Sequence, residues 1–449
     1  MRKTSAEYMK KLKSINKYWL IPITLMLGLG VYYLPTVHSR LSWRLDELRT
    51  KIKFFFNPPE DTVFRPSGQT DLTIETVIAT TRAEYALTLN QQATATQESG
   101  NTPTPTVTSI PLPASIILED VQYEYQHGHL NYCGPANFSM ALRFWGWDGN
   151  RDVIGKAIQP VEIDRNAMPY ELQDFIAENV PGISSASRVG GDIETLKRFV
   201  TNGFPVVVEK GIYEVDINKN YSWMGHYAFV TGYDDANETI IYQDSYQPQG
   251  SEPGPNRKIS YEKFVEDWRA FNYIFVVVYP IEKDAKVVKL LGNLANEETA
   301  NLHALEIAKK EATILTGTDR YFAWFNMGTS YTALHQYIDA ATAYDQAFVV
   351  YASLDGKQSL RPYRMIWYQT GPYFAYYYSN RFSDVIELAS LTLKDRPTPD
   401  LEESLLWRGR AYYMTGKTNL AVTDYRAALQ VHPNWLPAIQ ALQDLGLQP

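Results

Sequence analysis

The chain contains a single cysteine, and its neighbours give that residue the character of a nucleophile. Cys133 stands in the run NYCGPANF, where Pro135 is a favoured early residue of a helix and an apolar helical pattern begins at Phe138. A thiol at a helix N-terminus is close to unpaired N–H groups and the positive end of the helix dipole, which stabilise a thiolate. The sequence predicts a reactive thiol, and the alternative is a buried structural cysteine.

Thiolate catalysis needs a histidine that shares the proton, and His226 is the strongest of the seven candidates. It opens a predicted strand at 227–233, which a short polar loop joins to a second predicted strand at 239–243. The predicted loop, 233–237, is centred on residue 235, so the numbers of two opposed residues should sum to about 470. Asp244 is then directly across from His226. Asp244 could then fix the histidine tautomer, and the alternative role for it is a strand-end turn residue.

Acyl transfer also requires hydrogen-bond donors for the oxygen that becomes negatively charged in the tetrahedral intermediate. The backbone N–H of Cys133 is one predicted donor. Gln126, seven residues upstream, is the best side-chain candidate, and Gln122 and Asn131 are its rivals.

These residues occur in an order that resembles the papain-like cysteine peptidases, and in particular the bacteriocin-processing peptidases of family thirty-nine. The resemblance implies that Cys133 is the nucleophile, His226 the base and acid, Asp244 the residue that orients the histidine, and Gln126 the oxyanion donor. It covers about 165 of the 449 residues. The segments that carry it are 121–126, 132–136, 225–234 and 243–244.

The chain departs from that family in two respects. Ser245 follows Asp244, at a position where the family commonly has proline. No ATP-binding cassette or transporter spans follow the predicted domain, so cleavage of a leader peptide coupled to export is not implied.

The N-terminus carries the pattern of a membrane anchor. Residues 18–37 contain no charge and are mostly apolar, and 20 helical residues span about 30 Å, the thickness of the hydrocarbon core. Basic residues in the predicted tail, 1–17, slightly outnumber those after the span, which favours a cytoplasmic N-terminus and extracytoplasmic domains. The alternative is a cleaved signal peptide.

Residues 38–115 are predicted to form a juxtamembrane helix and a disordered stalk. Leu41, Leu45, Leu48, Ile52 and Phe55 recur at helical spacing, which indicates an amphipathic helix on the membrane surface or packed on the next domain. The region that follows is rich in threonine, proline, glutamine and serine, which is typical of an extended stalk.

Two globular regions follow the stalk. Residues 116–280 mix helical and strand patterns and predict an α+β domain, with a helix at 193–200 capped by Asp192 and strands at 204–208 and 273–279. Residues 281–449 show helical periodicity only. Six positions recur there 81 residues apart; they are Trp324, Gly328, Tyr331, Ala340, Tyr344 and Ala347, matched by Leu405, Gly409, Tyr412, Ala421, Tyr425 and Ala428.

This spacing resembles the tetratricopeptide repeat, an all-α solenoid of stacked helical hairpins. Small residues such as Gly328 and Gly409 would let paired helices approach, and aromatic rings would fill the gaps between hairpins. Such an array implies a protein partner, because stacked hairpins form a concave binding surface.

Composition excludes several classes of function. The net charge of −8 argues against nucleic-acid binding, and one cysteine excludes an intramolecular disulfide or a multi-cysteine metal site. No phosphate-binding glycine loop is present, so no cofactor is expected, and His127 and His129 lack a third ligand for a metal. His303, His335 and His432 lie in the repeat region and are interpreted as surface or packing residues.

The sequence thus predicts a membrane-anchored thiol hydrolase, in the first place a cysteine peptidase acting on a peptide or protein, with repeats that recruit a protein partner. One alternative is a catalytically idle papain-like scaffold protein. Another is transfer or amide hydrolysis on a non-protein substrate such as a cell-wall peptide.

Overall fold

The computed structural model forms two compact units, Met1–Pro58 and Pro59–Pro449, each considered by itself. The residues that the structure describes are 17–33, 37, 48, 52, 63–69, 111–129, 131–161, 167–215, 221–246, 253–354, 360–394 and 400–449. Leu41, Leu45 and Phe55 of the predicted juxtamembrane helix and most of the predicted stalk lie outside these residues.

The first unit contains helix α2 (Lys17–Tyr32), which is 16 residues long. Among the residues described, the structure contains no helix with the length and apolar character needed to cross a membrane. The membrane span predicted for 18–37 is therefore not supported, because the helix ends at Tyr32 and at 1.5 Å per residue reaches about 24 Å.

The second unit is built on a seven-stranded antiparallel sheet with the order β2-β7-β3-β4-β5-β6, in which β1 also pairs with β4. The strands are β1 (Ser115–Ile117), β2 (Ile183–Arg188), β3 (Val206–Val215), β4 (Tyr221–Asp234), β5 (Thr239–Gln243), β6 (Arg257–Ser260) and β7 (Phe275–Pro280).

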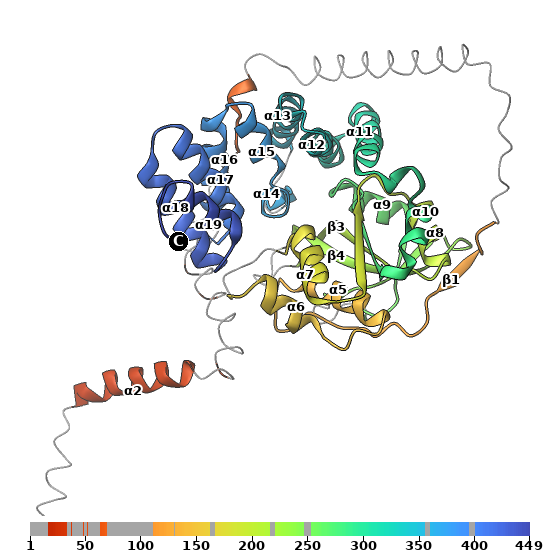
Figure 1. Ribbon diagram of the computed structural model, residues 1–449, viewed down its shortest axis with the longest axis horizontal. Coiled ribbons are helices and arrows are strands. Elements are labelled where there is room, and N and C mark those ends of the chain that lie inside the picture. The colour runs from red at the N-terminus through yellow and green to blue at the C-terminus, as the bar shows by residue number, and fades with distance from the viewer. Residues whose placement is uncertain are drawn as a thin grey trace, which may run out of the picture. The chain divides into compact units, whose positions relative to one another are not determined.

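Helices cover both faces of this sheet (Figure 1). One face is packed by α5 (Cys133–Phe144), α6 (Arg151–Ile158) and α7 (Pro169–Asn179), and the other by α8 (Ile193–Thr201), α9 (Tyr261–Arg269) and α10 (Asp284–Leu291). Alternate strand residues face opposite sides, so Val207 of β3 joins the first core and Val206 and Val208 the second. The predicted cap is confirmed: the Asp192 side chain accepts from the Thr195 N–H at 2.7 Å.

Among the residues described, the part of the chain after Pro280, called the helical region below, contains only helices and their connections, and several neighbouring helices, such as α12 and α13 or α17 and α18, pack as hairpins (Figure 1). Short 3₁₀ turns at Ile281–Lys283 and Gly292–Ala295 lead into it. The helices are α11 (Glu297–Ile314), α12 (Gly317–Ala333), α13 (Tyr337–Ser353), α14 (Met365–Tyr368), α15 (Gly371–Tyr378), α16 (Phe382–Lys394), α17 (Glu402–Met414), α18 (Thr418–Val431) and α19 (Leu436–Gln443).

Paired helices approach closely at a small residue in two hairpins, as predicted, and in both the residue that packs on the glycine is a tyrosine of the partner helix. A Cβ added to Gly328 of α12 would lie 2.6 Å from the Tyr344 ring of α13, and one added to Gly409 of α17 would lie 2.6 Å from the Tyr425 ring of α18. Only glycine lets these helices approach each other so closely around a buried tyrosine.

We expect Gly409→Ala to lower the free energy of unfolding by about 1–3 kcal/mol, because the methyl group overpacks the α17–α18 contact. Urea unfolding followed by circular dichroism measures the change. Thr423→Ala, at an exposed position of α18, is the control and should change stability by less than about 0.5 kcal/mol. Equal stability of Gly409→Ala and the unsubstituted chain would contradict this packing.

A third hydrophobic core joins the start of β4 to the helical region. Trp223 of β4, 1% exposed, stacks on Phe271 at 6.1 Å between ring centroids and lies 5.9 Å from Phe322 of α12. Tyr368 of α14 completes the cluster, 6.1 Å from Trp223. The helices therefore pack directly on the strand that carries His226.

One part of the predicted stalk differs from expectation. Phe64 is 5% exposed and belongs to the core of the helical region, and the short 3₁₀ helix Ser67–Gln69 follows it. The composition of the whole stalk predicted no packing, but this short run contains an aromatic residue and a proline that the helices can bury.

Candidate active site

Cys133 is the first residue of α5, as the glycine and proline after it predicted. Its N–H belongs to the first turn, where no intrahelical acceptor exists, and its side chain is partly exposed. Gly134 lies against the wall behind it: an added Cβ would be 3.1 Å from both Ala167 and Leu172. The thiol is therefore accessible at the start of α5, while the residue that follows it is tightly packed.

His226 and Asp244 form a buried pair. The His226 Nε2 lies 2.7 Å from Asp244 Oδ1, and both residues are 3% exposed. Because Nε2 faces Asp244, Nδ1 is the ring nitrogen that remains for Cys133, and the histidine lowers the pKa of the Cys133 thiol. The structure thus brings together the three predicted residues from α5, β4 and the end of β5.

The route to this pair differs from the predicted hairpin register. Phe229 pairs with Gln243 and Gly232 with Ile241, and the ladder is irregular between Val230 and Gly232. Asp244 therefore lies beyond the end of β5 and not directly opposite His226. His226 also stands inside β4, which begins at Tyr221 and not at the histidine.

Other groups around Asp244 fix its carboxylate, and the sequence analysis did not identify them. Oδ1 also accepts from the Tyr246 N–H at 3.0 Å, and Oδ2 accepts from the Arg257 guanidinium at 2.5 Å. The Tyr123 hydroxyl donates to the Asp244 carbonyl at 2.7 Å. Arg257 stands on β6, thirteen residues away, and only the sheet brings it here.

The charges of the three residues depend on one another. Burial alone would raise the pKa of Asp244, but His226, Lys210 and Arg257 lower it to about 2. Burial would likewise lower the pKa of His226, but Asp244 and Cys133 raise it to about 9. Desolvation opposes a thiolate at Cys133, yet the hydrogen bond and charge of His226, with the Tyr227 and Gly134 backbone, lower the thiol pKa. The arrangement favours a thiolate–imidazolium pair.

The low pKa of Asp244 makes its contribution to stability dependent on pH. A carboxyl whose pKa falls on folding stabilises the native state above its unfolded pKa of about 3.9 and loses that effect as pH falls through about 2. The unsubstituted chain should therefore exceed Asp244→Asn in unfolding free energy at pH 5, and this difference should shrink by about 2 kcal/mol near pH 2. Urea unfolding at several pH values measures it, and a difference that does not vary with pH would contradict the assignment.

Gln126 is held beside the site by two bonds to Ser245. The Ser245 hydroxyl donates to Gln126 Oε1 at 2.9 Å, and the Gln126 N–H donates to the Ser245 carbonyl at 2.9 Å. Asn137 Nδ2 donates to the same hydroxyl at 3.1 Å and to the Cys133 carbonyl at 2.8 Å. All three side chains are at most 5% exposed. Ser245, noted in the sequence only as a departure from the family, thus links Gln126 to the cysteine helix.

Of the rivals, Gln122 is engaged elsewhere, since its side-chain oxygen accepts from Arg143 of α5. Glu209 of β3 is a residue that the sequence analysis missed. It is 5% exposed and lies opposite Tyr227 in the β3–β4 ladder. Burial and the charge of Cys133 raise its pKa well above the usual range, which favours the neutral acid.

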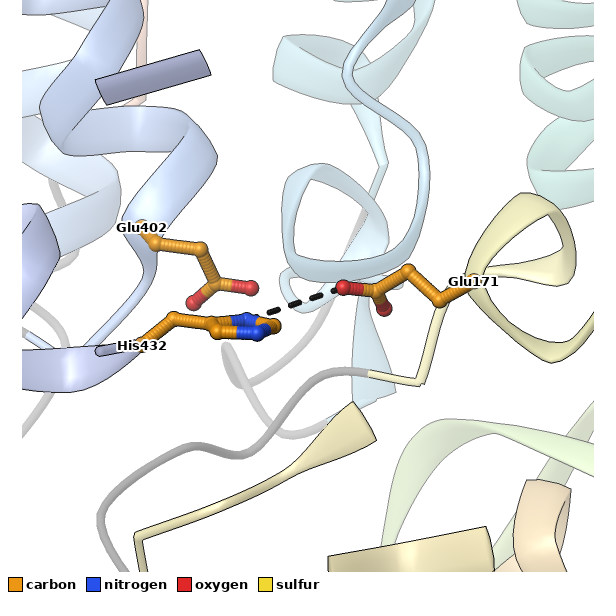
Figure 2. Close-up of side chains that lie close together, drawn as sticks. All are labelled: Glu171, Glu402 and His432. Carbon is orange, nitrogen blue, oxygen red and sulfur yellow. Dashed lines mark ion pairs between the residues drawn. The ribbon is translucent and has the colours of Figure 1, made fainter. Parts of the chain in front are cut away.

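A second cluster of polar side chains lies between α7, which covers the sheet, and the helical region (Figure 2). Ligand atoms of Glu171, Glu402 and His432 lie within 4.8 Å of one another, and His432 Nδ1 is 3.7 Å from Glu171 Oε1. Glu171 Oε2 also accepts from the Met168 N–H at 2.9 Å, which caps α7. Burial lowers the pKa of His432. The cluster connects α7 to the helical region and includes neither His127 nor His129.

The described residues place a cysteine at the start of a helix that packs on an antiparallel sheet, a histidine within β4 and an aspartate directly after β5, which resembles the arrangement of a papain-like cysteine peptidase domain. Comparison with known families agrees: residues 118–275, about a third of the chain, match the Peptidase_C39 like family. A search of curated proteins finds no match.

Three solved structures are similar to this part of the chain. A candidate C39-like peptidase from Bacillus anthracis is 16% identical over 37% of this chain and 98% of its own, with a TM-score of 0.29. The peptidase domain of Streptococcus ComA, a bi-functional ABC transporter involved in a quorum-sensing pathway, is 16% identical over 36% and 98%, with a TM-score of 0.26. Xylellain, a cysteine protease from Xylella fastidiosa, is 17% identical over 40% and 91%, with a TM-score of 0.29.

Proposed function

We propose that the protein is a thiol hydrolase, and specifically a cysteine peptidase, in which Cys133 is the nucleophile, His226 the acid and base, Asp244 the residue that orients the imidazole, and Gln126 an oxyanion donor. The observation that carries the proposal is the buried His226–Asp244 pair, 2.7 Å apart, together with the pKa of the only cysteine of the chain, which His226 lowers.

In this mechanism the Cys133 thiolate attacks the carbonyl carbon of a peptide bond and a C–S bond forms. The oxygen becomes an oxyanion, which accepts hydrogen bonds from the Cys133 N–H and the Gln126 amide. The imidazolium of His226 gives its proton to the leaving nitrogen as the C–N bond breaks. Water then attacks the thioester and gives its proton to His226, and the acid leaves as the thiolate is restored.

Alkylation of the full chain by iodoacetamide tests whether the thiol is activated. Because Cys133 is the only cysteine, the rate of adduct formation by mass spectrometry reports on this residue alone. We expect alkylation to persist well below pH 7, since His226 lowers the thiol pKa. In His226→Ala the reaction should titrate near the ordinary value of about 8.5.

The control is His335→Ala, a histidine of the helical region that hydrogen bonds with Tyr337. It should leave the profile unchanged. An unsubstituted chain that titrates near 8.5, with no effect of His226→Ala, would exclude an activated thiolate and favour the idle scaffold.

The helical region is proposed to be a tetratricopeptide-like array that recruits a protein partner. The proposal is supported by the hairpins in which Gly328 and Gly409 pack on tyrosine rings. An extracytoplasmic location is a separate proposal that rests on the sequence of residues 1–115 alone. Protease added to intact cells should digest the domain if it faces outward, and protection would contradict this orientation.

A further inference from the structure

Residues 63–69 lie on the helical region although they precede the sheet by almost fifty residues. The segment has no regular structure up to Pro66 and then forms the 3₁₀ turn Ser67–Gln69. It contacts residues of α13, of α15 and of α16, so it crosses two neighbouring hairpins.

Its apolar anchor is Phe64. The ring meets Phe348 of α13 edge to face, with 4.9 Å between centroids, and lies 6.0 Å from the Tyr376 ring of α15. Pro66 is also buried, whereas Arg65 between them is exposed. This alternation is what an extended peptide shows when it lies along a surface.

Its polar anchor is Ser67. The Ser67 N–H donates to Asp384 Oδ1 at 3.0 Å, and its hydroxyl donates to Asp384 Oδ2 at 2.7 Å. Asp384 is 2% exposed, so this carboxylate is desolvated and its bonds are strong. After it, Gly68 leaves no room for a side chain: an added Cβ would lie 2.5 Å from Asp345 Oδ2.

Asp384, which accepts both hydrogen bonds from Ser67, is held in place by other residues of the helical region. Arg381, between α15 and α16, donates to Asp384 Oδ2 at 2.7 Å and to both oxygens of Asp345 at 2.7 and 2.9 Å. Its guanidinium lies 4.4 Å from the centre of the Tyr376 ring, and the Tyr376 hydroxyl donates to Asp345 at 3.0 Å. A binding surface fixed in this way needs little reorganisation to accept a peptide.

We infer that this face of the helical region is a peptide-binding site for an extended segment with the pattern Phe-x-Pro-Ser-Gly, and that residues 64–68 occupy it in cis. A protein partner with the same pattern would compete with this segment. The inference deepens the recruiting role proposed for the helical region and is independent of the state of Cys133.

The test is fluorescence polarisation with a labelled synthetic peptide of residues 61–70 and the full chain. The double variant Phe64→Ala/Ser67→Ala weakens the contacts of residues 64–68 with the helical region, so the site becomes available and we expect saturable binding of the peptide. The unsubstituted chain should bind it about tenfold more weakly or worse, because a tethered segment competes at a millimolar effective concentration. Adding Asp384→Asn to the double variant should abolish binding, and Arg65→Ala in the peptide should not affect it.

A folded double variant that binds no peptide would overturn the inference. The unsubstituted chain gives a second measurement that does not depend on folding of the variant. Excess unlabelled peptide should increase hydrogen exchange at the Ser67 N–H, and a peptide with Phe64→Ala should not. Exchange that no peptide alters would show that the segment is a fixed part of the fold.

Discussion

Gln126→Ala is expected to slow acyl transfer about 100-fold while leaving alkylation of Cys133 unchanged. Hydrolysis of p-nitrophenyl acetate passes through a tetrahedral oxyanion, whereas iodoacetamide reacts at a tetrahedral carbon and forms none. Removing an oxyanion donor should therefore affect only the first reaction. Gln122→Ala is the matched control, because that glutamine binds Arg143, and it should change neither rate.

Ser245 offers a sharper form of the same prediction. Ser245→Ala removes the hydroxyl that holds Gln126 Oε1, and ester hydrolysis should fall about tenfold, which corresponds to one hydrogen bond. If Ser245 acts through Gln126, the double variant Gln126→Ala/Ser245→Ala should be no slower than Gln126→Ala alone. Additive losses would show that Ser245 acts independently, and a parallel fall in alkylation would show that the substitution disturbs Cys133 itself.

A chain that ends at Pro280 is expected not to fold cooperatively. The truncation exposes Trp223 and Phe271, whose partners Phe322 and Tyr368 belong to the helical region. It also removes bonds to the backbone of the sheet part, such as Asn326 to the Arg269 carbonyl at 2.7 Å. Size-exclusion chromatography and urea unfolding measure the outcome, and a monomeric fragment with a sharp transition would contradict it.

Trp223→Ala tests the same core in the full chain. Loss of this fully buried ring should lower the free energy of unfolding by about 3–5 kcal/mol. Tyr221→Ala, on the same strand but 56% exposed, should cost less than about 1 kcal/mol. Similar losses for the two variants would show that Trp223 does not connect the sheet to the helices.

Local sequence patterns predicted those helices and strands whose ends depend on residues close together in the sequence. The strand at 239–243 and the cap at Asp192 are observed as predicted. The prediction failed at the register of β4 and β5, because β4 continues to Asp234, which pairs with Thr239, so the turn lies further along the chain than the predicted loop. Asp244 still reaches His226 because the chain leaves β5 at Gln243 and bends toward the histidine.

The sequence alone was enough to predict that Cys133 lies at a helix start, which histidine and aspartate lie near it, and that small residues let the paired helices approach each other. Each of these follows from a local rule about helix ends, strands or residue size. Only the tertiary structure decided the roles of Ser245, Asn137 and Arg257, the shared core around Trp223, and the docking of Phe64. These contacts join residues distant in sequence, and such contacts depend on how the whole chain packs.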